Sequence, residues 1–188
     1  SLHLLNYQAM AYSALKRDKE ALLSYQKIAK KDPSLAGPYY NMGIILKRSG
    51  RIEEAISSYK KAISLKPDYV QAFNNLGVLY KDCEKYENAI TMFMKATELQ
   101  PDHQNSYYNL ALIKKEQGLS EEALELLLKV LDLNPEHGEA NYLNCLITLQ
   151  LGHWREGWKY YEYRWKISPQ NKVIWPIKDK PLWTGERA

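Results

Sequence analysis

The sequence predicts an all-α protein, built as a stack of antiparallel helix pairs. A register of 34 residues places a small residue on one helix of every pair: Ala9, Gly43, Gly77, Ala111 and Cys145. A small residue also opens the other helix, and four positions later comes a bulky one: Tyr25, Tyr59, Phe93, Leu127 and Tyr161. A proline closes each copy: Pro33, Pro67, Pro101, Pro135 and Pro169. Two short amphipathic helices cannot bury their apolar faces alone, so the copies must pack on one another.

The helix pairs follow in order over residues 2–35, 36–69, 70–103, 104–137 and 138–171. In three pairs a glycine ends the first helix in the left-handed conformation that glycine tolerates: Gly50, Gly118 and Gly152. Lys16 and Glu84 take this place in the first and third pairs. We expect those two turns to end differently or to carry a small strain. Asp18 and Ser120 stand where second helices begin and are predicted as their N-caps.

This period, with its order of small, bulky and proline positions, resembles the tetratricopeptide repeat over residues 2–171. The resemblance implies a right-handed superhelical solenoid, in which first helices line a concave groove and second helices form the outer wall. The family's inward positions are the second, fifth, sixth, ninth, twelfth and thirteenth of each repeat. Carried onto this sequence, they predict these groove residues: Tyr40, Asn41, Ile44, Lys47, Asn74, Asn75, Val78, Lys81, Tyr108, Asn109, Leu112, Lys115 and Tyr142.

The predicted groove has the chemistry of a peptide-binding surface. An asparagine amide can pair with both polar groups of an extended backbone. We expect Asn75 and Asn109 to be exposed for this purpose. The lysines add positive potential that favours an acidic ligand, and the tyrosines and aliphatic residues add contact area. As an alternative, the asparagines are common at this position across the family and indicate no particular ligand, and the lysines are only exposed to solvent. The family's carboxylate clamp needs asparagine at the ninth position, which is apolar here in every repeat, as at Ile44 and Val78.

The C-terminal part departs from the repeat pattern. Trp154, Trp158 and Trp165 crowd the fifth pair. A set of residues here resembles the junction to a glycosyltransferase-like domain in bacterial repeat proteins: Trp158, Tyr161, Glu162, Arg164, Trp165, Pro181, Leu182, Trp183 and Gly185. This resemblance implies a parent enzyme whose catalytic half is absent from this chain, which we read as a fragment. Alternatively, the aromatic residues cap the stack. Residues 172–188 would then be a capping tail, with Trp175 in the slot of a sixth repeat.

Composition narrows the function further. The formal charge is +4, from 26 Lys and Arg against 22 Asp and Glu. This suits an acidic partner but does not indicate nucleic acid, even though basic and aromatic residues interleave over 154–166. No apolar run approaches the roughly 18–20 residues needed to span a bilayer. Cys83 and Cys145 are expected to be buried thiols, too far apart for a disulfide, which favours a reducing, cytoplasmic location.

No catalytic, metal or cofactor motif is evident. His103 and His137 occupy one position in neighbouring repeats, so we expect them about 10 Å apart, too far for one metal ion. Neither zinc spacing, nor a phosphate loop, nor a nucleophile elbow occurs. We therefore predict a non-catalytic protein-interaction scaffold without cofactors, which binds a peptide or partner segment. Two alternatives stay open: the recruiting region of a larger glycosyltransferase-like enzyme, and a scaffold that self-associates through its C-terminal tail.

Overall fold

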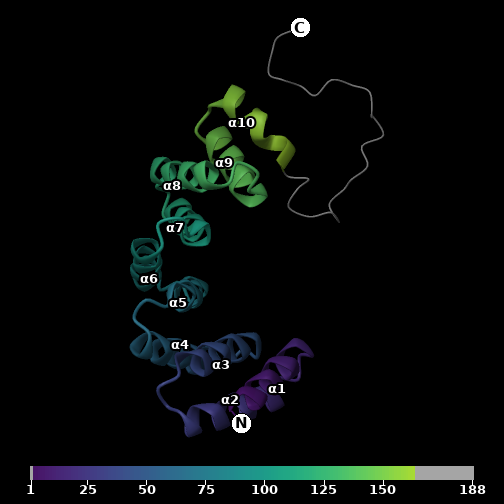
Figure 1. Ribbon diagram of the computed structural model, residues 1–188. Coiled ribbons are helices and arrows are strands. Elements are labelled where there is room, and N and C mark those ends of the chain that lie inside the picture. The colour runs from purple at the N-terminus through teal and green to yellow at the C-terminus, as the bar shows by residue number, and fades with distance from the viewer. Residues whose placement is uncertain (1, 164–188) are drawn as a thin grey trace, which may run out of the picture. The chain divides into compact units, whose positions relative to one another are not determined.

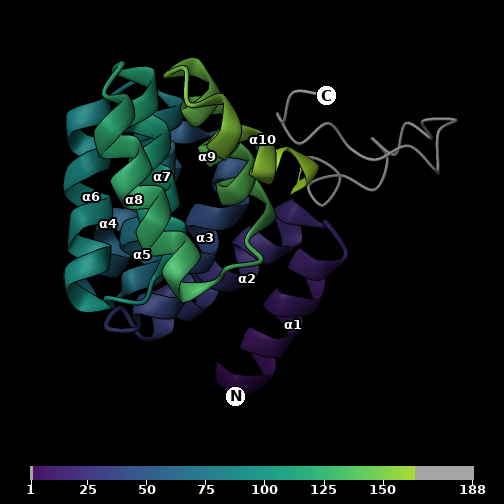
Figure 2. The ribbon, with the colours of Figure 1, turned by 90° about the horizontal axis from the view of Figure 1, so that it is seen from above.

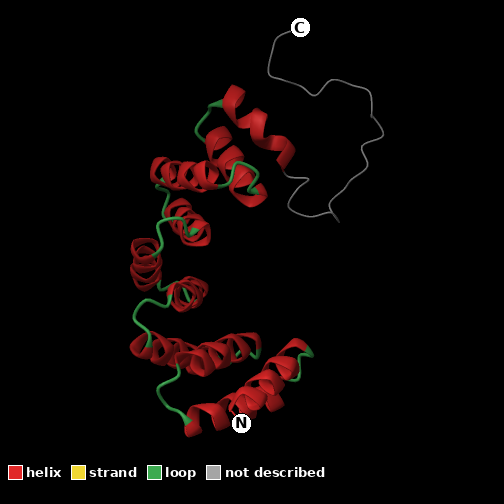
Figure 3. Ribbon diagram, in the orientation of Figure 1, coloured by secondary structure: helices red, strands yellow, loops and turns green. Residues whose placement is uncertain are grey.

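The structure is a computed structural model that describes residues 2–163. Within this range the chain is helical and has no strand, which confirms the predicted all-α class (Figures 1 and 3). The first helices of the pairs are α1 (Leu2–Ala14), α3 (Ala36–Arg48), α5 (Val70–Asp82), α7 (Gln104–Glu116) and α9 (Gly138–Gln150). The second helices are α2 (Asp18–Lys31), α4 (Ile52–Leu65), α6 (Tyr86–Leu99), α8 (Ser120–Leu133) and α10 (Trp154–Tyr160), and the 3-10 helix η1 (Tyr161–Tyr163) follows.

The chain divides into two compact units, residues 1–101 and 102–188. Unit 1 contains α1 to α6, and the described part of unit 2 contains α7 to η1. Inside each unit, every helix packs against the helix before it and the helix after it. In unit 1, the view from above shows α4 and α6 on one side and α3 and α5 beside them (Figure 2). Unit 1 therefore has a first-helix face and a second-helix face.

In the second and third pairs, a bulky side chain on the second helix packs against a glycine on the first helix. Tyr59 is 1% exposed and Phe93 is fully buried. A β-carbon added to Gly43 would lie 2.6 Å from ring carbon Cε1 of Tyr59, and one on Gly77 would lie 2.7 Å from Cε1 of Phe93. The rings thus occupy the space that a side chain on the first helix would need. The fifth pair differs, because Tyr161 is only half-buried and the glycine, Gly157, lies on the second helix, where an added β-carbon would be 2.5 Å from Leu149 Cδ2.

The turn after each first helix has the same backbone in all five pairs. Its left-handed residue has φ of 73° at Gly50, 78° at Gly118 and 83° at Gly152. Lys16 and Glu84 adopt the same conformation, with φ of 56° and 58°. Their turns therefore do not end differently, and they place side-chain-bearing residues where glycine is favoured, at a cost of about 1 kcal/mol each.

The two N-cap predictions are wrong. Asp18 and Ser120 are the first residues of α2 and α8, whose N-caps are Arg17 and Leu119, without a side-chain cap bond. The left-handed turn leads the chain into each helix one residue earlier than expected. Ser120 is instead buried, and the Asp18 carboxylate accepts hydrogen bonds from the next repeat.

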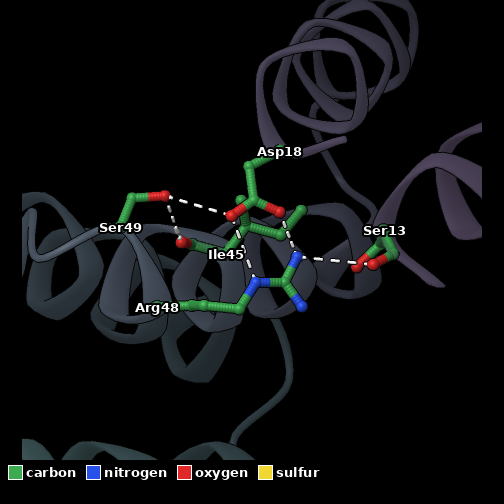
Figure 4. Close-up of polar contacts among 5 residues, drawn as sticks. All are labelled: Ser13, Asp18, Ile45, Arg48 and Ser49. Atoms are coloured by element: carbon green, nitrogen blue, oxygen red, sulfur yellow. Dashed lines mark hydrogen bonds and ion pairs between the residues drawn. The ribbon is translucent and has the colours of Figure 1, made fainter. Parts of the chain in front are cut away.

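A polar cluster joins the first two repeats (Figure 4). The Arg48 guanidinium, at the end of α3, forms an ion pair with Asp18 through Nη2, and its Nε donates to Asp18 Oδ2 at 3.1 Å. The same Nη2 lies 3.4 Å from the Ser13 carbonyl oxygen. Ser49 Oγ donates to the Ile45 carbonyl at 2.9 Å and lies 3.4 Å from Asp18 Oδ2. The hydrogen bond from Arg48 lowers the pKa of Asp18.

Candidate functional site

Eight of the predicted groove residues lie on the first-helix face of unit 1. Four come from α3 and four from α5, in matching order: Tyr40, Asn41, Ile44, Lys47, Asn74, Asn75, Val78 and Lys81. All eight are half-buried. They are therefore reachable from solvent and also packed against neighbours, which limits how their side chains are oriented. We call this set the α3–α5 surface.

Hydrogen bonds link the asparagines of the α3–α5 surface to a tyrosine of the preceding repeat. Asn75 Nδ2 donates to the Tyr40 hydroxyl at 3.2 Å, and Asn74 Nδ2 donates to Asn75 Oδ1 at 3.4 Å. The expectation that Asn75 is exposed is wrong, because the amide packs beside the Tyr40 hydroxyl. The Asn75 amide is therefore held in one orientation by Tyr40 and Asn74 before any ligand arrives.

Tyr40 is also the centre of an aromatic cluster. Its ring centroid lies 4.8 Å from that of Tyr69 and 5.9 Å from that of Tyr59. The ammonium of Lys66 lies 5.0 Å from the Tyr69 ring. Burial raises the pKa of all three phenols, so they remain neutral hydrogen-bonding groups at pH 7. Tyr69 was missed by the sequence reasoning, which considered only positions inside the first helices.

The lysines of the α3–α5 surface share a carboxylate that the sequence reasoning also missed. Asp82 Oδ2 lies 3.3 Å from Lys47 Nζ, and its Oδ1 lies 3.5 Å from Lys81 Nζ. Asp82 is the thirteenth residue of its repeat, one of the family's inward positions, so its presence could have been read from the sequence. Two positive charges and one negative charge leave a smaller positive potential than the lysines alone would give.

A hollow adjoins the α3–α5 surface at the start of α3. Asn6 and Asn41 line this cavity of about 430 Å³. Apolar side chains from α1, α2 and the start of α3 provide most of the remaining lining: Leu2, Ile28, Leu35 and Pro38. Such a cavity suits a peptide residue whose apolar side chain contacts the apolar lining while its backbone forms hydrogen bonds with the asparagine amides.

The five remaining predicted residues lie in unit 2, all half-buried: Tyr108, Asn109, Leu112 and Lys115 on α7, and Tyr142 on α9. Asn109 is half-buried rather than exposed as expected, and its Nδ2 donates to the Asn105 carbonyl one turn back at 2.8 Å. Lys115 Nζ lies 3.6 Å from the Glu116 carboxylate.

An aromatic pair in unit 2 matches one in unit 1. The Tyr108 and His137 rings lie 5.5 Å apart, and Tyr40 and Tyr69 occupy the same two positions two repeats earlier. Burial raises the pKa of Tyr108, and Glu139 adds to this rise. His137 Nδ1 accepts from the Ala140 backbone N–H at 3.2 Å. This histidine therefore anchors the start of α9 while its ring extends the face of Tyr108.

The structure also bears on metal binding, membrane spans and the two cysteines. Over residues 2–163, no group of three or more histidine, cysteine or acidic side chains is placed to hold a metal ion. In the same range, no helix combines the length and apolar character of a membrane span. Cys145 is buried, but Cys83, the C-cap residue of α5, is only half-buried, which corrects the expectation of two buried thiols.

Several expectations fall on residues outside the described range. They are the stack-capping role of Trp175, self-association through residues 172–188, and most of the glycosyltransferase-like junction, from Arg164 to Gly185. Of that junction, Trp158 and Tyr161 are described, and their rings meet edge to face with centroids 4.7 Å apart. This contact fits either a junction or a cap.

Family models and solved structures bear on the fold. A model described as TPR repeat matches residues 45–82, and two described as Tetratricopeptide repeat match residues 7–34 and 68–136. MamA from Desulfovibrio magneticus is 19% identical, with a TM-score of 0.78 over 91% of this chain and 97% of that one. PilF from Pseudomonas aeruginosa is 19% identical, with a TM-score of 0.81 over 90% and 78%. YrrB, described as a TPR protein with an unusual peptide-binding site, is 21% identical, with a TM-score of 0.70 over 89% and 86%. The comparison with curated proteins gave no match.

Proposed function

The chain is a tetratricopeptide repeat protein, and from this premise we propose that it is a non-catalytic scaffold that binds an extended peptide segment along its first helices. The observation that carries the proposal is the hydrogen-bonded row Asn74–Asn75–Tyr40. Because its amides are already oriented, a peptide backbone that binds there does not have to order them.

The neighbouring side chains define what the peptide should offer. Ile44 and Val78 lie one turn beyond the amides and supply apolar contact. The cavity beside Asn41 has the lining and size for one apolar side chain. Lys47 and Lys81 share Asp82, so the surface favours an acidic ligand modestly rather than strongly. Peptide binding by YrrB supports a peptide ligand for this fold.

Affinity measurements on a paired asparagine variant test the proposal. Peptides are first selected by display on the immobilised wild-type chain and then measured by fluorescence anisotropy. Asn75→Ala combined with Asn109→Ala removes one amide from each unit, and we expect affinity to fall about tenfold. Tyr40→Phe keeps the ring but removes the hydroxyl that orients Asn75, so it should give a smaller loss.

The matched control is Glu125→Ala, which removes an exposed polar side chain from the second helix α8. It should leave the affinity of the selected peptides unchanged. The proposal is wrong if these peptides bind the double asparagine variant as tightly as the wild type while circular dichroism shows both to be folded.

Two further roles remain proposals that share this scaffold function. As the recruiting region of a glycosyltransferase-like enzyme, the chain would present polypeptide acceptors to a catalytic domain. As a self-assembling scaffold, it would accept the C-terminal tail of another copy. Sedimentation over a wide concentration range separates the second role from the others, because only self-assembly makes the apparent mass rise with concentration.

A further inference from the structure

Several cavities on the second-helix face of unit 1 are not used by the proposed function, and two of them match each other. One, of about 460 Å³, lies among α2, α3 and α4. The other, of about 380 Å³, lies among α4, α5 and α6. No residue of the α3–α5 surface lines either of them. We call them the first and second outer cavities.

The two outer cavities are the same structural site, one repeat apart. Their floors come from α3 and α5 at positions separated by 34 residues, as Tyr39 and Phe73, Met42 and Leu76, and Leu46 and Tyr80. Their walls repeat in the same register, with Gln26 matching Lys60 and Ser58 matching Met92. A site that recurs in this way can hold a ligand that has a repeated feature of its own.

The floors are apolar and mostly buried, with a small exposed fraction. Met42, Phe73 and Tyr80 keep 8%, 7% and 7% of their surface in contact with solvent. The rim residues Ser57 and Lys61 are exposed. Each outer cavity is therefore an apolar hollow with a polar rim, which is the form that receives an apolar side chain of a partner.

The ridge between the two cavities is positively charged. Lys61 lines the first cavity and Lys60 lines the second, both exposed on α4. Among the described residues, neither ammonium lies within ion-pair distance of a carboxylate, although Lys60 Nζ lies 5.9 Å from the Tyr80 ring. The neighbouring Arg51 is already neutralised by Glu54, with Arg51 Nε to Glu54 Oε1 at 2.6 Å.

We propose that these outer cavities and the lysine ridge form a second docking surface for an acidic segment of a partner protein. One apolar side chain of the segment fills each cavity, and carboxylates between them meet Lys60 and Lys61. The two cavities are one full repeat apart, so their anchors are separated by more than about 8–10 Å, the distance between packed helices, which is at least about three residues of an extended chain. A second copy of this chain is a poorer occupant, because its formal charge is +4.

Synthetic peptides test this docking surface directly. The probes are fluorescein-labelled glutamate-rich peptides that carry two leucines at varied spacing, with lysine-rich peptides of the same spacings for comparison. We expect acidic peptides with leucines at least about three residues apart to bind best, and less tightly as salt is added. Amide chemical-shift changes should centre on Gln26, Ser57 and Asn88 rather than on Asn41 and Asn74.

Variants on the rim complete the test without altering the core. Lys60→Glu with Lys61→Glu should weaken binding about tenfold, and Ser57→Trp should weaken it by filling the first cavity. The matched control, Lys30→Glu with Lys31→Glu, makes the same charge change at two exposed lysines of α2 that line neither cavity. It should change affinity less than twofold.

Three results of the peptide measurements would overturn this proposal. They are the absence of binding by any acidic peptide, equal binding by the lysine-rich set, and equal loss of affinity in the two charge-reversed pairs. Self-association that Ser57→Trp abolishes would also overturn it, in favour of a second copy as occupant. Because Asn75→Ala should leave this binding intact, failure here is distinguishable from failure of the α3–α5 surface.

Discussion

Single residues decide how closely the two helices of a pair approach. Gly77 leaves the space that the Phe93 ring fills, and Gly43 does the same for Tyr59. The buried rings supply much of the apolar area removed from water, at roughly 25 cal/mol per Å². This contact depends on a missing side chain, and so it is sensitive to any addition there.

Gly77→Leu should therefore destabilise the protein by about 1–3 kcal/mol or more, since the new side chain overlaps the Phe93 ring. The free energy of unfolding from urea titration measures this. Gly37→Ala is the control, because a β-carbon at Gly37 in α3 meets nothing within 4 Å. It should leave stability unchanged or raise it slightly. Equal losses of unfolding free energy in the two variants would contradict the interpretation that the Phe93 ring fills the space beside Gly77.

At the scale of elements, the Arg48–Asp18 pair fastens the start of α2 to the end of α3. No other repeat combines an arginine and an aspartate at these two positions, so the contact distinguishes the first repeat junction. Both groups are partly exposed, with side-chain exposures of 37% and 25%. We therefore expect a contribution below about 1 kcal/mol.

Asp18→Asn should lower stability at pH 7 by that small amount. Arg48 depresses the pKa of folded Asp18 below its ordinary value of 3.8, so the stabilisation is present above that value. It is lost as the pH falls through the lower, folded-state pKa. Urea midpoints of wild type and Asp18→Asn should therefore converge at a pH well below 3.8. A gap that stays constant down to that pH would show that the carboxylate charge is irrelevant.

At the scale of the whole molecule, stability should be distributed unevenly along the stack. In a repeat array each unit is held mainly by its neighbours. Of the residues of α1 only Ala9 is buried, while Leu4, Tyr7 and Met10 are 70%, 69% and 50% exposed. By contrast, α5 buries seven residues between its neighbours.

Hydrogen exchange should therefore be fastest in α1 and slowest in α5 within unit 1, since opening free energies follow the burial of each element. Mass spectrometry of peptic fragments after brief labelling measures the difference. Exchange that is uniform over residues 2–101 would indicate that unit 1 opens as one cooperative body.

The repeat register carries most of what the sequence predicted about the fold. Small and bulky positions such as Gly77 and Phe93 were readable, because their packing partners are fixed by the period. The start of α2 at Asp18 was not, because the cap depends on how the preceding turn enters the helix. Likewise, position alone placed Asn75 on the first-helix face. Its bond to Tyr40 joins residues 35 positions apart and needs three-dimensional structure.

The half-buried thiol at the end of α5 offers a practical route to both proposals. Cys83 directly follows Asp82, which lies between Lys47 and Lys81, whereas Cys145 is enclosed. A maleimide dye should therefore label the native chain at one site, next to the first-helix ligand. The emission of the dye should change when a peptide binds the α3–α5 surface. It should stay constant when a peptide binds the outer cavities on the second-helix face.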